Sequence, residues 1–340
     1  MYYELIPETG RFYKANLHCH TTISDGKQTP EQVKEFFKSR GYSAVCYTDH
    51  EVLVGHEDLC DKDFIALHGY EVAIKKDEGG HTGLFMPVYH FNIIAKTQSQ
   101  RYMPRFYRDN PSCAGDSRRW IHEVGVYDKT GDDYIDHTEY NVDWINEYLA
   151  GVKAGGYLIT YNHPMWSMQS ALDYAGLQNI HAIETINGGC IVLNDNTAMH
   201  YEVLLRQGLR IVPVGGDDNH AEAGCGLGWT MIKAPALTYE ALIDSYEKGY
   251  CYASEGPEIH SLIIEDGKIK IKTSEAAAIT LFADSRYVRT KRSRTETYTE
   301  AEFDYVPEKF GKFFRLEVRD AAGYKAFSNA YYPDEIAKLI

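Results

Sequence analysis

Short apolar runs alternate with stretches in which apolar residues recur at helical spacing over the first 255 residues. Short runs rich in Val, Ile, Tyr and Phe predict β-strands. The runs that predict strands are KANLH (14–18), YSAVCYTDH (42–50), FIALHGYEVAI (64–74), GLFMPVYHFNIIA (83–95), GYLITYNHP (156–164), IHAIETIN (180–187) and RIVPVGGDDNH (210–220).

Four further stretches predict helices. The first, TPEQVKEFFKSRG (29–41), offers Thr29 as the N-cap, Pro30 at the first helical position and Gln32 to complete a capping box. The other three are 139–156, 197–208 and 238–249. Each of the four therefore lies between predicted strands or follows one.

Strands that alternate with helices predict parallel βαβ units. About seven such units favour a closed or nearly closed barrel over an open doubly wound sheet. The first strand is not followed by a glycine-rich nucleotide-binding fingerprint, which also disfavours the doubly wound fold. We expect an α/β fold, a TIM-like barrel, over residues 1–255.

Two regions depart from this rhythm. Residues 97–140 are rich in Arg, Tyr, Asp and Gly, and we expect a long insertion there, either a lid over one face or a surface excursion. From residue 256 the sequence has strand runs separated by turn signals, such as EDG (265–267). Residues 256–340 therefore predict a small all-β domain.

Composition limits the class of partner. The formal net charge is −14, which argues against binding nucleic acid or an anionic membrane. The 7 cysteines are scattered without a CxxC motif, and neither a signal peptide nor a membrane-spanning stretch is visible. We expect a cytoplasmic protein that acts on a small molecule.

Metal-binding residue types recur at the predicted strand ends. In chain order they are His18 and His20, Asp25, His50, Glu71, His90, His163, Asp218 and His220. The carboxyl ends of parallel barrel strands open onto one face, where active sites lie. Imidazole and carboxylate are suitable ligands for zinc, manganese or iron. The set as a whole therefore predicts a metal centre.

Alternation along a strand refines this prediction. His18 and His20 are expected to point to one side and Cys19 to the other, into the core. The same alternation is expected to place Asp218 beside His220.

These motifs carry a resemblance. NLHCHTTISDGKQTPEQVKEFFKSRGYSAVCYTDHEV, HGYEV, NHP and DDNH resemble the PHP (polymerase and histidinol phosphatase) family over about residues 12–255. The tail, with FFRLEVRDAAGYKAFSNAYY, resembles the β domain that ends a branch of metallohydrolases similar to carbaryl hydrolases. The resemblance implies a distorted (βα)7 barrel, a β-sandwich-like domain, and a phosphoesterase with two or three Zn, Mn or Fe ions.

The resemblance also implies a division of the ligands. His18, His20, Glu71 and Asp218 would hold a first metal; Glu71, His90 and His163 a second; Asp25, His50 and His220 a third. His81 in GGHTG competes with His90 for the second metal, and Asp25 is alternatively a residue that orients a ligand.

The predicted reaction is hydrolysis by metal-activated water, with Glu71, Asp218 and His220 in catalytic roles and His220 as one source of the leaving-group proton. Asp49, Asp217 and Glu184 are candidates for orienting the ligands. The candidates for substrate contact are Arg118, Arg119, Arg101 and Arg105 for a phosphate, Trp166 for a ring, and His81.

Two alternatives remain open. The same metals would also hydrolyse carbamates, esters or amides, because activated hydroxide attacks carbonyl carbon as well as phosphorus. A non-catalytic binding module stabilised by metal is the other.

Overall fold

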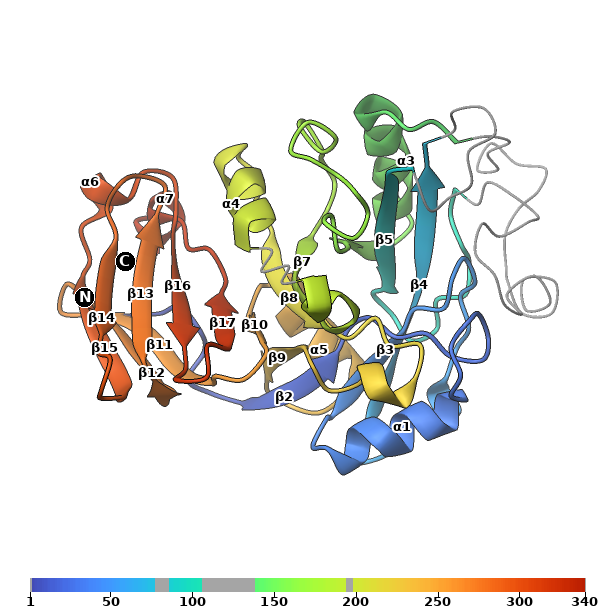
Figure 1. Ribbon diagram of the computed structural model, residues 1–340, viewed down its shortest axis with the longest axis horizontal. Helices are drawn as coiled ribbons and strands as arrows, with labels where there is room; N and C mark the ends of the chain where they lie inside the picture. Colours follow the sequence, from blue (N-terminus) through green and yellow to red (C-terminus); the bar gives the residue numbers. More distant parts are fainter. Residues whose placement is uncertain (1, 77–85, 106–137, 194–197, 340) are drawn as a thin grey trace.

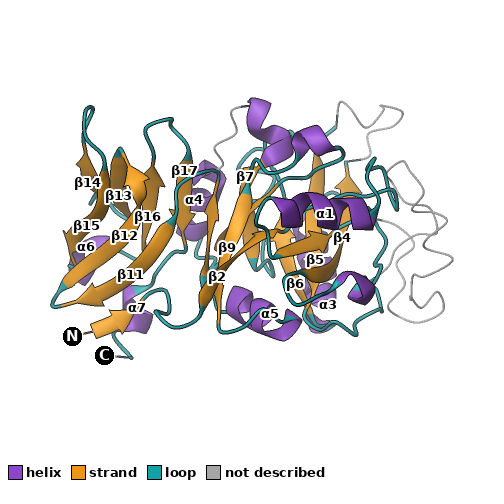
Figure 2. Ribbon diagram, turned by 90° about the horizontal axis from the view of Figure 1, so that it is seen from below, coloured by secondary structure: helices purple, strands orange, loops and turns teal. Residues whose placement is uncertain are grey.

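The computed structural model describes residues 2–76, 86–105, 138–193 and 198–339. His81, Cys113, Arg118, Arg119 and most of the predicted insertion lie outside these residues. The molecule is elongated, with an α/β part at one end and a strand-rich part, which holds both termini, at the other (Figure 1). The longer helices accompany the strands of the α/β part (Figure 2).

All seven strands that the sequence predicts are present in the α/β part. They are β2 (Arg11–Asn16), β3 (Ala44–Tyr47), β4 (Ile65–Lys75), β5 (Val88–Ala95), β6 (Tyr157–Tyr161), β7 (Ala182–Asn187) and β8 (Val212–Gly216). They are neighbours in this order within one sheet. The sheet therefore follows the chain, as short sequential connections favour.

The expectation of uniformly parallel strands is wrong at β5. The pairs β2–β3, β3–β4, β6–β7 and β7–β8 are parallel, whereas β5 is antiparallel to both β4 and β6. The antiparallel β4–β5 pairing continues past the two strands, because the Lys76 N–H donates to the Pro87 carbonyl (3.1 Å).

The sheet continues beyond β2 through β9 (Trp229–Ala234) and β10 (Cys251–Ser254) into the strand-rich part. Among the described residues no ladder joins β8 to β2, so the architecture is a mixed α/β sheet, and the ladders do not show a closed barrel. Just beyond their ends, however, a parallel bridge links Cys19 to Asn219. This bridge lies at the predicted metal centre.

The four predicted helices are present. They are α1 (Pro30–Ser39), α3 (Val142–Ala154), α4 (Ala198–Arg206) and α5 (Tyr239–Glu247). Three 3-10 helices, η1 (Glu57–Leu59), η3 (Gly188–Leu193) and η4 (Glu222–Gly224), lie between the longer elements. Ile145, Tyr148, Leu149 and Val152 of α3 are buried in the core shared with β5 and β6. These helices cover the sheet with their apolar faces.

The strand-rich part adds an antiparallel sheet of β1 (Tyr2–Glu4), β11 (Ile259–Glu265), β12 (Lys268–Ala276) and β15 (Tyr298–Asp304). The end of the large sheet packs on it with β14 (Arg289–Arg292), β13 (Ala278–Ala283), β16 (Phe314–Arg319) and β17 (Lys325–Ser328). Two short helices, α6 (Pro307–Phe310) and α7 (Pro333–Ile336), complete it.

Two details bear on the predicted division of the chain. The turn EDG is the expected hairpin: Asp266 and Gly267 both have positive φ (51° and 72°), as a type I′ turn requires. The N-terminal strand β1 pairs with β11, so the first residues belong to a sheet that is otherwise C-terminal. The boundary at residues 255 and 256 stays a prediction.

Two chemical expectations concern the whole chain. The six described cysteines form no disulfide with one another. None of the described helices has the length and apolar character that a membrane span needs.

The N-terminus of α1 gives a direct test of the sequence interpretation. Thr29 Oγ1 accepts from the Gln32 N–H (3.3 Å), and Gln32 Oε1 accepts from the Thr29 N–H (2.9 Å). Thr29→Ala removes this cap, and we expect the free energy of unfolding to fall by about 1 kcal/mol. Urea unfolding followed by circular dichroism measures it. Thr29→Ser keeps the hydroxyl; an equal loss in that variant would assign the effect to the methyl group.

Candidate metal centre

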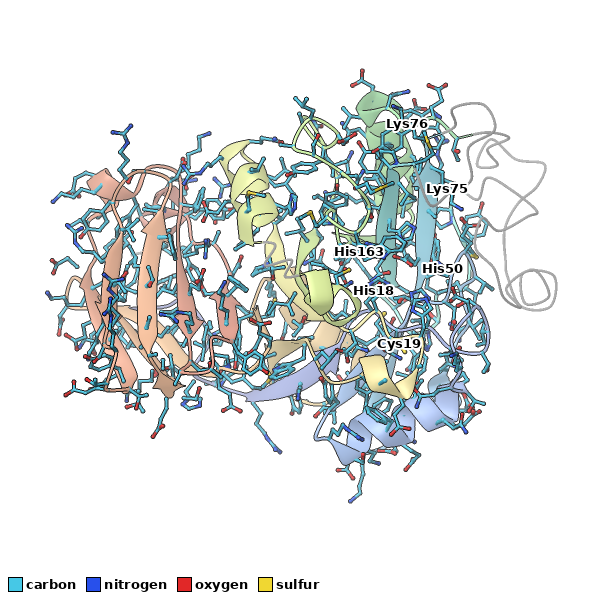
Figure 3. The ribbon with its side chains drawn as sticks, viewed as in Figure 1. His18, Cys19, His50, Lys75, Lys76 and His163 are labelled. Carbon is cyan, nitrogen blue, oxygen red and sulfur yellow. The ribbon has the colours of Figure 1, made fainter. Side chains whose placement is uncertain are left out.

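All nine residues that the sequence marks as metal ligands converge at one place in the α/β part. They form four overlapping groups whose ligand atoms lie within 4.8 Å of one another: His20, Asp25, His50 and His220; His18, His163 and Asp218; His18, His20 and Glu71; and Glu71, His90 and His163. His18, His50 and His163 mark the cluster in Figure 3. The predicted convergence of distant positions is therefore present in the geometry.

The segments that follow β2 and β8 are joined at the centre. The His20 N–H donates to the Asn219 carbonyl (3.1 Å), and the Asp218 N–H donates to the His18 carbonyl (3.0 Å). Asn16 Nδ2 also donates to Asn219 Oδ1 (3.0 Å). These bonds place both histidines of HCH beside the carboxylate of Asp218, although 200 residues separate them.

Gly216, at the end of β8, permits this approach. A Cβ atom at this position would lie 2.8 Å from His18 Cβ and 3.1 Å from Glu184 Oε1. Any larger residue would push β8 away from the first histidine. The second glycine of VPVGG is thus explained by close contact rather than by a turn.

Glu71 is the centre of the cluster. Its carboxylate lies 3.0–3.4 Å from a nitrogen of each of five imidazoles: His18 (3.3 Å), His20 (3.4 Å), His50 (3.1 Å), His90 (3.0 Å) and His163 (3.3 Å). Both Glu71 oxygens take part, and the side chain is buried. One carboxylate thus faces imidazoles from four different segments of the chain.

Asp218 shares three of these partners. Its carboxylate oxygens lie 3.1 Å from His20 Nε2, 3.3 Å from His18 Nε2 and 3.6 Å from His163 Nε2. The backbone of Asp218 has φ 50°, so the residue has left the extended conformation of β8. Asp218 and His220 are close, as expected (3.8 Å), but a turn rather than strand alternation brings them together.

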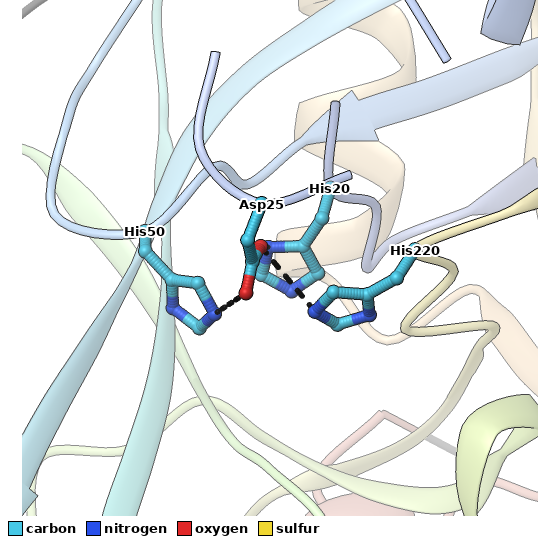
Figure 4. Close-up of side chains that lie close together, drawn as sticks. All are labelled: His20, Asp25, His50 and His220. Atoms are coloured by element: carbon cyan, nitrogen blue, oxygen red, sulfur yellow. Dashed lines mark ion pairs between the residues drawn. The ribbon is translucent and has the colours of Figure 1, made fainter. Parts of the chain in front are cut away.

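Asp25 organises the outer end of the cluster (Figure 4). Its oxygens lie 3.4 Å from His220 Nε2, 3.5 Å from His50 Nε2 and 3.7 Å from His20 Nδ1. The side chain of His220 is 42% exposed, whereas those of His18, His20 and His163 are buried. The cluster therefore opens to solvent at this end.

His90 lies at the cluster because β5 is antiparallel, which the prediction of parallel strands did not include. It lies near the start of β5, and because β5 runs antiparallel, its beginning is at the same edge as the ends of the parallel strands. His90 Nδ1 is 3.0 Å from Glu71 Oε1. The competing His81 lies outside the described residues.

The donor set fits divalent cations. One carboxylate has about four lone-pair positions, which are too few for hydrogen bonds from five imidazoles. His18 Nε2 and His20 Nε2 face each other at 3.1 Å. Within the described part of the chain, the buried Nδ1 atoms of His20 and His90 have no hydrogen bond of ordinary geometry. Nitrogen lone pairs gathered around buried carboxylates form the ligand set of a transition metal.

The electrostatics agree with this set. Burial alone would raise the pKa of Glu71, but the imidazoles of His90, His18 and His163 outweigh it and hold the pKa well below its usual value. Burial likewise opposes ionisation of Asp218, yet His18, His20 and His163 lower its pKa. Both carboxylates are therefore anionic at neutral pH, as metal ligands must be.

Glu184 fixes the orientation of two ligands. Its Oε1 accepts the His18 Nδ1–H (2.7 Å), which leaves Nε2 of His18 facing Glu71 and Asp218. Its Oε2 accepts from the backbone N–H of His163 (3.2 Å) and from Asn187 Nδ2 (2.9 Å). This carboxylate–histidine contact is the usual support of a metal-binding imidazole.

The two other candidates for orienting the ligands hold loops. Asp49 accepts hydrogen bonds from the backbone N–H and the hydroxyl of both Thr21 and Ser24 (2.7–3.1 Å), which fixes the turn that carries Asp25. Asp217 accepts from three successive backbone amides, residues 226–228. Burial raises the pKa of Asp217 to about 6, although these amides oppose the shift.

The substrate candidates have different outcomes. Arg101 is engaged with Glu57 and the Gln98 carbonyl, and Arg105 with Glu147, so neither is placed for a phosphate at the cluster. Arg118 and Arg119 lie outside the described residues. Trp166 is at the cluster: its ring centroid lies 5.1 Å from that of His163 and 5.5 Å from that of His90.

Sequence reasoning missed the asparagines. Asn162 Nδ2 donates to Glu71 Oε1 (2.8 Å), and Asn16 Oδ1 accepts from the backbone N–H of His18 (3.3 Å) and of Asp217 (2.9 Å). Both precede a ligand within the motifs NLHCH and NHP. A polar residue at the buried end of an apolar strand was the available signal.

Comparison with known proteins gives distant matches only. No family model matches the chain, and no curated protein matches it. It is similar to a solved two-domain protein from Bacteroides vulgatus, described as containing a predicted PHP-like metal-dependent phosphoesterase (13% identity, 97% of this chain, 98% of that chain, TM-score 0.45).

Two further solved structures are similar to about two thirds of the chain. One is a proposed metal-dependent phosphoesterase from Bifidobacterium adolescentis (17% identity, 64% of this chain, 90% of that chain, TM-score 0.38). The other is an amidohydrolase from Chromobacterium violaceum with bound sulfate and no metal (17% identity, 61% of this chain, 87% of that chain, TM-score 0.37).

The role of Glu184 is open to a direct test. Glu184→Gln replaces one carboxylate oxygen with an NH2 group, which donates hydrogen bonds and cannot accept them. The remaining oxygen cannot accept from His18, His163 and Asn187 together. We expect metal affinity to fall 10- to 100-fold, roughly the cost of losing such a support. Competition with a chelating fluorophore measures it. Glu240→Gln, on the exposed surface of α5, is the matched control, and unchanged affinity in Glu184→Gln would contradict the assignment.

Proposed function

We propose that this protein is a metal-dependent hydrolase of the PHP family, and that it releases phosphate from a small organic phosphate. The observation that carries the proposal is the set of nine imidazole and carboxylate side chains gathered around Glu71, Asp218 and Asp25. The sequence resemblance supports the phosphoester as substrate. On this proposal, β2–β8 correspond to the distorted barrel of that family.

The groups suggest how the residues divide among cations. Glu71 with His18 and His20, joined by Asp218, forms one set, and Glu71 with His90 and His163 forms a second. His20, Asp25, His50 and His220 form a third, so His20 stands between the first and third sets. When bound, divalent cations activate water near neutral pH and offset the charge of a phosphate.

The protein side chains perform the remaining tasks. Glu71 Oε1 faces His18 of the first set as well as His90 and His163 of the second. Its Oε2 faces His20 and His50, so this carboxylate reaches all three sets. Buried walls around His18 and His163 keep bulk water from the inner ligands. The low pKa values of Glu71 and Asp218 keep these ligands deprotonated.

His220 has two roles that depend on occupancy. Burial lowers the pKa of His220, but Asp25 and Asp218 outweigh burial and raise it, which favours the protonated imidazole. Its partial exposure places this proton at the open end of the cluster. With two sets filled, His220 is the proton donor to the departing alcohol; with three filled, it is a ligand.

Metal removal tests the function. Dialysis against a strong chelator is expected to abolish hydrolysis of p-nitrophenyl phosphate, and zinc, manganese or iron(II) to restore it. Glu71→Gln removes the shared ligand, and we expect kcat/KM to fall by more than ~100-fold, beyond the loss from an outer support. Elemental analysis and phosphate release measure the two effects.

Glu240→Gln again serves as the surface control. If the added metal restored hydrolysis of an aryl carbamate but not of p-nitrophenyl phosphate, the protein would be a carbamate, ester or amide hydrolase instead of a phosphoesterase. Bound metal without turnover of any ester would favour the binding module. Absence of transition metal from undepleted protein would remove the basis of the proposal.

A further inference from the structure

Trp166 lies at the end of the metal cluster formed by His90 and His163, whereas Asp25 and His220 form another end. Its indole contacts the rings of His90 and His163, with centroids 5.5 Å and 5.1 Å away, and both histidines lie against Glu71. Half of the Trp166 surface (50%) nevertheless stays exposed. The indole therefore faces both the ligands and the solvent.

The segment that carries Trp166 is held firmly. The Ser167 N–H donates to the His163 carbonyl (3.1 Å), and the Gln169 N–H donates to the Pro164 carbonyl (2.9 Å). The Val88 N–H donates to the Ser167 carbonyl (3.2 Å), which ties the segment to the start of β5. Ser167 Oγ also lies 3.2 Å from His163 Nδ1. The exposure of Trp166 is thus a feature of an ordered loop.

Two other exposed apolar side chains lie on the same loop as Trp166. Met165 and Met168 are 52% and 47% exposed, and Met168 has φ 55°, a strained conformation for a methionine. Exposed apolar side chains beside a cluster of imidazoles and carboxylates are typical of a ligand-binding wall. A loop that served only to hold His163 would have no need of three large apolar side chains facing solvent.

We propose that Trp166, flanked by Met165 and Met168, binds an aromatic ring of the substrate, so that the preferred substrates are phosphate esters whose alcohol carries a flat ring. This inference rests on the proposed function and adds the class of alcohol. Tryptophan suits the task because its large face stacks on any aromatic ring, whether an aryl group or a nucleobase. A ring held there lies beside the ligands His90 and His163, which leaves the phosphate to the cluster.

Hydrolysis of matched substrates tests this. The esters 2-phenylethyl phosphate and 2-cyclohexylethyl phosphate have similar leaving groups and differ in the flatness of the ring; adenosine monophosphate is the nucleobase arm. Trp166→Ala is expected to lower kcat/KM for the phenyl ester about tenfold, as loss of one stacking contact does, and for the cyclohexyl ester less than threefold. Trp166→Phe is expected to restore most of the loss.

A control variant and a nucleotide substrate show whether the effect is specific to Trp166 and which kind of ring it binds. Met199→Ala, another exposed apolar residue, on α4, is expected to leave all rates unchanged. If Trp166→Ala lowers kcat/KM equally for adenosine monophosphate and the phenyl ester, the site accepts both nucleobases and aryl groups. A loss for the phenyl ester alone restricts it to aryl groups.

Binding without turnover separates the two proposals. Calorimetric titration of metal-loaded protein with phenylphosphonate and with cyclohexylphosphonate needs no hydrolysis. Tighter binding of phenylphosphonate that Trp166→Ala abolishes supports the aromatic site even where no phosphate ester is cleaved, which would overturn only the proposed reaction. Equal binding of both phosphonates, or an equal loss of rate on all three esters in Trp166→Ala, would overturn the aromatic site and leave Trp166 as a support for His163.

Discussion

The structure depends on one buried carboxylate. Glu71 lies in the middle of β4 with almost no access to solvent, and a charge in such a place costs several kcal/mol unless it is compensated. The compensation comes from imidazoles on four separate segments and from the amide of Asn162. Every segment that reaches the centre is constrained to meet this charge.

The constraint explains features that would otherwise be costly. His163 and Asp218 both have positive φ (24° and 50°), and such strain is retained where the surroundings over-determine it. Gly216 lets the end of β8 contact His18. Glu184 forms hydrogen bonds with both His18 and the backbone of His163. Strain, close packing and hydrogen bonds thus serve the same centre.

The two ends of the cluster differ in polarity. At one end Asp25 lies beside the partly exposed His220. At the other, Trp166 presents an apolar wall against His90 and His163. A polar end and an apolar end are thus joined by the same group of imidazoles.

Several elements follow from local sequence alone. The capping box at Thr29 and the type I′ turn at Asp266 and Gly267 depend on contacts within four residues, so their sequence signals are complete. The nine ligands were also visible, because imidazole and carboxylate after apolar runs are unusual wherever they occur. Spacing within NLHCH indicated that His18 and His20 lie together, whereas Asp218 and His220 of DDNH are brought together by a turn.

The remaining features depend on partners far along the chain. The direction of β5 is seen in its antiparallel pairing with β4, and the hydrophobic pattern of a buried strand reads the same in either direction. The bond between His18 and Glu184 spans 166 residues, and nothing near either residue records it. The sequence by itself determined which side chains carry the chemistry; the tertiary structure decided which of them meet, because that depends on how the strands pair.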